Sequence, residues 1–217
     1  MYRACMTKTS LVVLLLVVGC FVGAAALSSA FRPAEGAGLG LRLASWWAVV
    51  AATLFAVTGI ERLPLASVGL QSVGLGTIGW GAAVFVCAFL LAGVVARLLM
   101  PALGLEQDAG QAARIAARPI ALQLMLFATA AVVEELVCRA VVISRLAPLS
   151  PTLAVAASIL LFTLPHLFSW KPAQLVFVAP LGAVFALFFL WRGDLPACIL
   201  AHFLVDTAGF LLLRLPR

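Results

Sequence analysis

The chain has 217 residues, of which 65% are hydrophobic and 10% are charged, and its mean hydropathy is +1.20. A soluble domain carries about a quarter charged residues and about half apolar residues, so this composition excludes an ordinary soluble protein and indicates that lipid is the solvent. The formal net charge of +6 comes from basic residues that are scattered singly. They form no stripe that follows a phosphate backbone, and we therefore expect no nucleic-acid partner.

Long unbroken apolar runs predict an all-α fold, namely a polytopic transmembrane bundle of about seven helices with a membrane-embedded polar cavity. A helix needs roughly 20 residues to cross about 30 Å of hydrocarbon, and backbone groups in lipid must be bonded within the segment. The apolar run of the first span exceeds the roughly 7–15 residues of a signal-peptide core, which favours an uncleaved helix. The expected spans are residues 11–30, 43–60, 78–100, 120–144, 152–168, 173–190 and 195–213.

A polar segment separates two parts of what we expect to be one integrated membrane domain. Residues 1–119 contain spans without ionisable groups at their centres, whereas residues 120–217 form a helical core whose spans contain such groups. Asp194 is well placed to cap the last span, with Pro196 in its first turn. We expect the polar segment to form an interfacial helix, and its charged residues are Glu106, Asp108, Arg114 and Arg118.

The distribution of basic residues leaves the membrane orientation open. All of the 14 Lys and Arg residues except Arg139 lie outside the motifs described below. If the N-terminus is cytoplasmic, five of these residues fall on the cytoplasmic side and eight on the other side, which is the reverse of the usual bias. A cleaved first span or an additional half-helix would change this count.

Three of the expected spans contain ionisable residues at positions where the membrane makes them costly. A charged side chain at a helix centre costs about 2.5–3.5 kcal/mol on insertion scales. Both histidines of the chain and three of its eight acidic residues nevertheless fall in these spans. We therefore predict that they form one catalytic site. The residues are Glu134, Glu135 and Arg139 in the fourth span, His166 in the fifth, and His202 and Asp206 in the seventh.

Helical spacing assigns provisional partners to these residues. Glu135 and Arg139 are four residues apart and share a helix face, which predicts a structural ion pair. His202 and Asp206 share a face for the same reason. Glu134 points about 100° away from Glu135, so we expect it to face a different partner and to remain available as a general base. Taken singly, each group has a structural reading as an ion pair, a packed histidine or an interhelical clamp, but three such spans together favour catalysis.

The three motifs also resemble the signature of a known family. Glu134-Glu135-x-x-x-Arg139, Phe162-x-x-x-His166 and His202-x-x-x-Asp206 are similar, in this order, to motifs of the CPBP intramembrane proteases. That family comprises the CAAX prenyl endopeptidases, bacteriocin-processing enzymes and abortive-infection (Abi) proteins. The resemblance covers roughly residues 120–217 and implies hydrolysis of a peptide bond in a membrane-associated or lipidated peptide.

The resemblance also implies a role for each motif residue. Glu134 and His166 would activate a water molecule, and His202 would stabilise the oxyanion of the tetrahedral intermediate. The fourth position is commonly asparagine in the family, whereas this chain has Asp206. An ionised carboxylate has no proton to donate, so Asp206 must either be protonated or orient His202.

Zinc is the one cofactor that the residue types allow. Two histidines and two carboxylates form a plausible near-tetrahedral ligand set, and the candidate ligands are Glu134, His166, His202 and Asp206. An HExxH motif is absent, and the five cysteines contain no CxxC pair, so we favour a metal-free site and expect no cofactor.

The expected partners are a peptide or protein substrate in or at the membrane and the lipid bilayer itself, and the expected location is the plasma membrane. The sequence does not determine an oligomeric state. Two alternatives remain open. One is a proton- or ion-coupled transporter, because intramembrane Glu, His and Asp also form proton relays, although no inverted repeat is evident. The other is a catalytically idle membrane scaffold.

Overall fold

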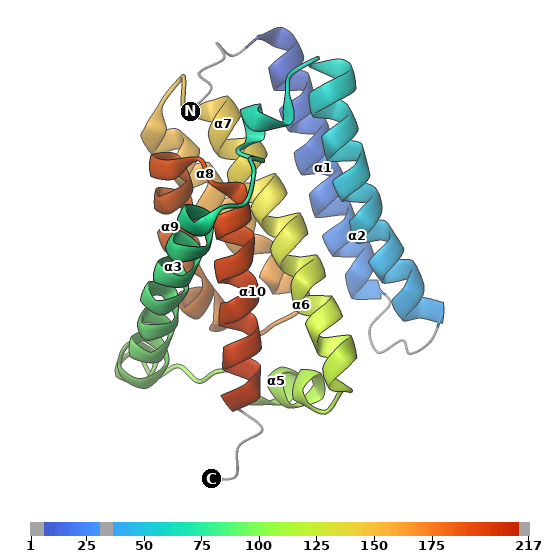
Figure 1. Cartoon of the computed structure of the whole chain (residues 1–217). Coiled ribbons are helices and arrows are strands. Elements are labelled where there is room, and N and C mark those ends of the chain that lie inside the picture. Colours follow the sequence, from blue (N-terminus) through green and yellow to red (C-terminus); the bar gives the residue numbers. More distant parts are fainter. Residues whose placement is uncertain (1–6, 31–36, 213–217) are drawn as a thin grey trace.

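A computed structural model describes residues 7–30 and 37–212, and within these ranges all regular structure is helical (Figure 1). Several long helices continue directly into short π- or 3₁₀-helical segments, so that they form longer rods. The long helices are α1 (Lys8–Ala30), α2 (Ala37–Phe55), α3 (Leu75–Val94), α6 (Ile120–Glu134), α8 (Pro151–Thr163), α9 (Gln174–Arg192) and α10 (Leu195–Leu212). The shorter elements are η1 (Ala56–Ile60), η2 (Leu65–Val68), η3 (Val95–Leu99), α4 (Met100–Ala102), α5 (Ala109–Ala116), η4 (Glu135–Val141), α7 (Val142–Leu146) and η5 (Leu164–Phe168).

Six of these rods are long and apolar enough to cross a membrane, which confirms the predicted polytopic helical bundle. Each overlaps one of the expected spans almost completely, although the helices that begin at α2 and α3 start a few residues earlier than predicted. The six are Lys8–Ser29, Gly38–Ile60, Leu75–Ala102, Pro151–Phe168, Gln174–Arg192 and Leu195–Leu212.

The fourth expected span, residues 120–144, is not among these six, but it is helical throughout as α6, η4 and α7. Every residue from 135 to 145 is buried. This rod contacts α1, α2, α8, α9 and α10. Surrounding helices therefore take the place of lipid around its charged side chains, which removes most of the cost of having them at this depth.

Helix α5 corresponds to the expected interfacial segment and lies across one end of the bundle, beside the ends of α6 and α10 (Figure 1). Asp108 caps it by accepting a 3.0 Å hydrogen bond from the backbone N–H of Gln111. That hydrogen bond, together with the nearby Lys171, holds the pKa of Asp108 below its ordinary value. At the other end of α5, the side-chain amide of Gln123 donates to three carbonyls, those of Ile115, Ala116 and Arg118. The C-terminal end of α5 is thus attached to α6.

The start of α10 is capped as the sequence predicted. The carboxylate of Asp194 accepts a 3.0 Å hydrogen bond from the N–H of Ala197, and Pro196 occupies the first turn, where a missing N–H costs nothing. The N–H of Leu195 donates instead to the carbonyl of Gly69, in the connector between the second and third spans. These bonds set the position of the helix that carries His202.

Gly69 is needed for this contact because the connector approaches the turn between α9 and α10 closely. Its φ is +72°, and a Cβ atom at this position would lie 2.5 Å from the carbonyl oxygen of Gly193. A side chain here would therefore push the connector away from α10.

A buried ion pair connects the end of the second span with the end of α7. Arg145 Nε lies 2.9 Å from Glu61 Oε1, and Arg145 Nη2 lies 2.6 Å from Glu61 Oε2. The two side chains are only 3% and 2% exposed. Such a bidentate pair has a defined geometry, so it fixes the N-terminal helices against the rod that carries the two motif glutamates.

Candidate active site

The structure brings the first and third motifs together in the interior of the bundle. Glu134 is the last residue of α6, and Glu135 and Arg139 belong to the π-helix η4. His202 and Asp206 lie on the facing helix α10. Because α6 and η4 pack against α10, residues separated by almost 70 positions in the sequence become neighbours.

His202 lies between the two glutamates. Its Nδ1 is 2.8 Å from Oε1 of Glu135, and its Nε2 is 3.9 Å from Oε2 of Glu134. A carboxylate only accepts hydrogen bonds, so Nδ1 donates to Glu135. This bond fixes the ring and directs Nε2 toward Glu134, which is the usual consequence when one imidazole nitrogen is held by a carboxylate.

The predicted ion pair of Glu135 with Arg139 is present, and Glu134 faces a different partner from Arg139, as expected. The sequence did not indicate that both carboxylates would face His202. Two features explain this shared partner. The imidazole ring has a nitrogen on each side, and the helix changes from α to π where Glu134 ends α6 and Glu135 begins η4. Such π segments occur frequently at functional sites.

Arg139 is fully buried against Glu135. Its Nε lies 3.4 Å from Glu135 Oε2, and both side chains have zero exposure. Its Nη2 donates to the carbonyl of Gly182 at 3.4 Å. The guanidinium carbon lies 4.0 Å from the ring centroid of Phe162 and 5.6 Å from that of Phe185. Arg139 is therefore enclosed by protein groups and has no access to a substrate.

Glu134 and Asp206 form the accessible side of the cluster. Asp206 Oδ2 lies 3.7 Å from Nε2 of His202, which is too long for a direct hydrogen bond. The Glu134 and Asp206 side chains are 22% and 30% exposed, whereas His202 is 8% exposed. Two carboxylates thus face one ring nitrogen on the side that is not sealed.

His166 lies in the 3₁₀-helix η5, where its Nδ1 donates to the carbonyl of Phe162 at 2.9 Å. The neutral ring then has Nε2 as its acceptor. Its centroid lies 5.3 Å from that of Phe162, and the Phe162 centroid lies 5.9 Å from that of His202. Among the described residues, no hydrogen bond or ion pair joins His166 to Glu134. The link between the two histidines is the Phe162 ring.

The four candidate zinc ligands do not form a compact group in this structure. Within residues 7–30 and 37–212, no three His, Cys, Asp or Glu side chains are close enough together to hold a metal ion. Glu134 and Asp206 both face Nε2 of His202, whereas Nδ1 of His166 is bonded to the backbone. The described residues thus provide no ready set of three ligands for zinc.

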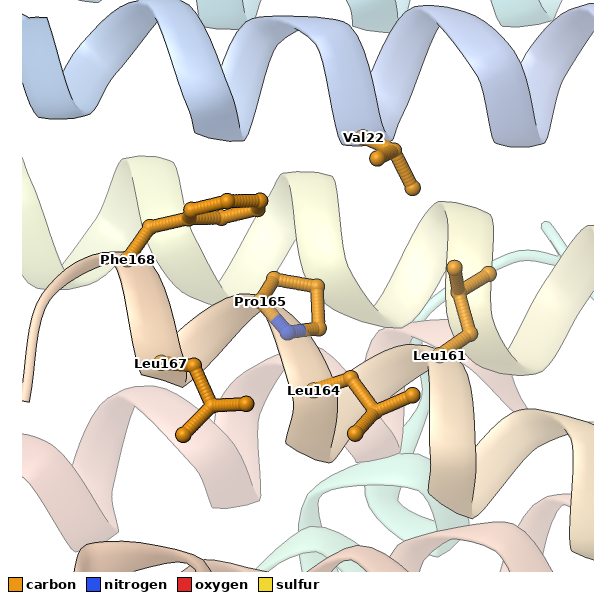
Figure 2. Close-up of a pocket in the computed structure, with 6 residues that line it drawn as sticks. All are labelled: Val22, Leu161, Leu164, Pro165, Leu167 and Phe168. Carbon is orange, nitrogen blue, oxygen red and sulfur yellow. The ribbon is translucent and has the colours of Figure 1, made fainter. Parts of the chain in front are cut away.

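An apolar pocket of about 360 Å³ lies between α1 and the continuous helix formed by α8 and η5 (Figure 2). Pro165 and Leu167, which flank His166 in the sequence, both contribute to its wall. The same short helix thus positions His166 and borders an apolar space. The lining residues are Val22, Leu161, Leu164, Pro165, Leu167 and Phe168.

Sequence reasoning missed this pocket and the contribution of α9. Gly182 and Phe185 contact Arg139 but belong to a span without charged motif residues. No local spacing signals these contacts, because they form only when α9 packs against η4.

Comparison with protein-family models gives a match over residues 116–208 to the family described as type II CAAX prenyl endopeptidase, Rce1-like. This range contains all three motifs. Comparisons with curated proteins and with solved structures gave no match. The match confirms the resemblance indicated by the three motifs.

Proposed function

We propose, from the match of residues 116–208 to the CAAX prenyl endopeptidase family, that the chain hydrolyses a peptide bond in a membrane-associated or lipidated peptide. The main support is the geometry around His202. Glu135 holds one ring nitrogen, while the partly exposed carboxylates of Glu134 and Asp206 face the other.

Glu134 is the general base in this proposal. Its carboxylate is partly exposed, and the ion-pair partner of Arg139 is Glu135. Glu134 takes a proton from a water molecule while the water oxygen forms a bond to the scissile carbonyl carbon. The tetrahedral intermediate then collapses, the C–N bond breaks, and the proton passes from Glu134 to the leaving amine. A positioned base of this kind contributes about 10²–10⁴-fold in rate.

The two histidines have different roles. When His202 is protonated on both nitrogens, Nδ1–H remains on Glu135 and Nε2–H stabilises the oxyanion, as a preorganised donor does. His166, whose Nδ1–H is engaged by the Phe162 carbonyl, uses Nε2 to orient the attacking water. When ionised, Asp206 orients His202 from the Nε2 side of the ring. When protonated, it donates a hydrogen bond to the oxyanion.

The apolar pocket between α1 and the rod of α8 and η5 supports a substrate that is anchored in the membrane. Its lining consists of aliphatic and aromatic side chains, which match a lipid chain in chemistry. A lipid chain or apolar side chain of the substrate in this pocket would hold the substrate along η5, the segment that carries His166.

The proposal is tested by comparing membrane peptides from cells that produce the wild type, Glu134→Gln or Glu106→Gln. Glu106 is exposed and lies in the interfacial segment, so it provides a matched control for the same chemical change. Cleavage products should be present with the wild type and Glu106→Gln and should be lost with Glu134→Gln. Unchanged products in the Glu134→Gln cells would refute the assignment.

A further inference from the structure

Helix α9 carries none of the three motifs, yet Phe185 on this helix contacts two motif side chains. Its ring centroid lies 5.6 Å from that of His202 and 5.6 Å from the guanidinium carbon of Arg139. The side chain is 2% exposed. Phe185 is therefore directed into the site and not toward lipid.

Phe162 on α8 makes the same two contacts from a different helix. Its centroid lies 4.0 Å from the guanidinium carbon of Arg139 and 5.9 Å from the His202 centroid. Arg139 and His202 are also the two side chains that contact Glu135. An aromatic face attracts a desolvated guanidinium, so both rings favour the observed position of Arg139.

Gly182 allows this close packing one turn before Phe185. Its carbonyl accepts the hydrogen bond from Arg139 Nη2, and a Cβ atom at this position would lie 2.8 Å from Cδ1 of Phe162. Residues three apart on a helix share a face. Helix α9 thus presents Gly182 and Phe185 together to the buried charges.

We propose that Phe162 and Phe185 form an aromatic clamp that holds His202 and Arg139 on either side of Glu135, and that Phe185 is a positioning residue for the proposed hydrolysis. The clamp limits rotation of the imidazole, so that Nδ1 stays on Glu135 and Nε2 stays directed at Glu134 and Asp206. Misplacement of a reacting group by about 1 Å can reduce a rate about 10²-fold. This inference rests on the proposed function for its kinetic consequence, but its geometric part is independent of it.

Phe185→Leu tests the clamp, and Phe188→Leu is the matched control. Phe188 lies on the same helix and is 7% exposed, but it contacts Trp80 and Trp191 instead of the site. Phe185→Leu should lower kcat about 10- to 100-fold with little change in KM and should alter the pH profile of kcat. Phe188→Leu should leave kcat and its pH profile near those of the wild type. Equal losses of kcat in the two variants, in proportion to their melting temperatures, would show that Phe185 only fills the core.

A second measurement does not depend on activity. The chain has only two histidines, so protein labelled with ¹⁵N in histidine gives ring-nitrogen signals from two imidazoles, and His166→Gln assigns each set to its residue. In the wild type and in Phe188→Leu, the Nδ1 signal of His202 should be that of a strongly hydrogen-bonded nitrogen. In Phe185→Leu, the same signal should shift toward that of a weaker hydrogen bond or broaden, because the ring is less restricted. An unchanged His202 spectrum in Phe185→Leu would overturn the clamp. Failure of cleavage by the wild type, with the expected spectral change intact, would instead count against the proposed function alone.

Discussion

Oε1 of Glu135 and Nδ1 of His202 are 2.8 Å apart in a fully protein-enclosed part of the bundle. This hydrogen bond joins η4 to α10, and Glu135 is at the same time the ion-pair partner of Arg139. A single carboxylate thus orients a histidine and neutralises an arginine. Replacement of Glu135 should therefore lower the stability of the fold through Arg139 and lower activity through His202, and the two effects can be measured separately.

We expect Arg139→Leu to lower the melting temperature in detergent, because removing one partner of a buried pair typically costs about 3–5 kcal/mol. Addition of Glu135→Leu should restore part of the loss, since no unpaired charge then remains between these positions. The double variant should nevertheless stay inactive, because His202 has lost the acceptor for Nδ1. Thermal unfolding and a cleavage assay of both single variants and the double variant measure the two effects. A double variant that is no more stable than the worse single variant would contradict the pairing.

The cap of α5 leads to a prediction about pH. The pKa of Asp108 is held below its ordinary value of 3.8 by the hydrogen bond from the Gln111 N–H and by Lys171. Because the folded-state pKa is depressed, the cap stabilises α5 above pH 3.8 and is lost as the pH falls through the lower folded-state value. Hydrogen exchange protection of the α5 amides should therefore fall with acidification in the wild type. Asp108→Asn keeps an acceptor but cannot titrate, so its protection should depend less on pH. The same acid dependence in both proteins would contradict this account.

The apolar runs predicted the membrane spans because length and hydropathy are properties of each segment alone. The central position of residues 120–146 was not predictable in this way. That segment is as apolar as the others at its start, and only packing against neighbouring helices shows that residues 135–145 face no lipid. The π-helical segments, such as η4, were likewise not predicted, because an apolar run does not distinguish α from π hydrogen bonding.

Motif spacing predicted which residues of the site belong together. The hydrogen bonds and contacts among them depend instead on how the helices pack. The i,i+4 spacing of Glu135 and Arg139 correctly implied that the two side chains share a face. The hydrogen bond from His202 to Glu135 was missed, because the position of η4 along α10 depends on how the two helices pack and not on the spacing within either helix. Phe185 and Gly182 were missed for the same reason. The catalytic roles of Glu134, His166, His202 and Asp206 remain predictions.

The structure also leads to a prediction of orientation, because successive rods run between the end of the bundle that contains α5 and the opposite end (Figure 1). Among the described residues, the end that contains α5 has five basic residues, namely Arg42, Arg97, Arg114, Arg118 and Lys171, and the opposite end has four, namely Lys8, Arg62, Arg145 and Arg192. In the sequence, Arg32 follows α1, Arg214 and Arg217 follow α10, and Arg3 precedes α1. The positive-inside bias then places α5 at the cytoplasmic surface.

Single cysteines test this orientation in a background in which Cys5, Cys20 and Cys87 are replaced by serine, while Cys138 and Cys198 are buried. Ser72 and Gly110 are both exposed and lie at opposite ends. With the chain produced in a bacterial host, a membrane-impermeant maleimide should label Ser72→Cys in intact cells and Gly110→Cys only after permeabilisation. The reverse pattern, or equal labelling of both positions in intact cells, would refute the predicted orientation.

The last prediction concerns Asp206 and the metal together. If zinc is bound through this residue, Asp206→Asn should weaken metal binding, because a neutral amide is a poor ligand for it. If the site is metal-free, the amide can donate a hydrogen bond to the oxyanion, so activity should survive or rise and a chelator should have no effect. Purified wild type and Asp206→Asn are compared by elemental analysis and by cleavage assays with and without a chelator.

Stoichiometric zinc in the wild type, with activity lost on chelation and restored by zinc, would overturn the metal-free mechanism. An active and metal-free Asp206→Asn protein would support a hydrogen-bond donor at this position, since the carboxylate and the amide have the same shape and differ only in charge and in the proton that the amide can donate.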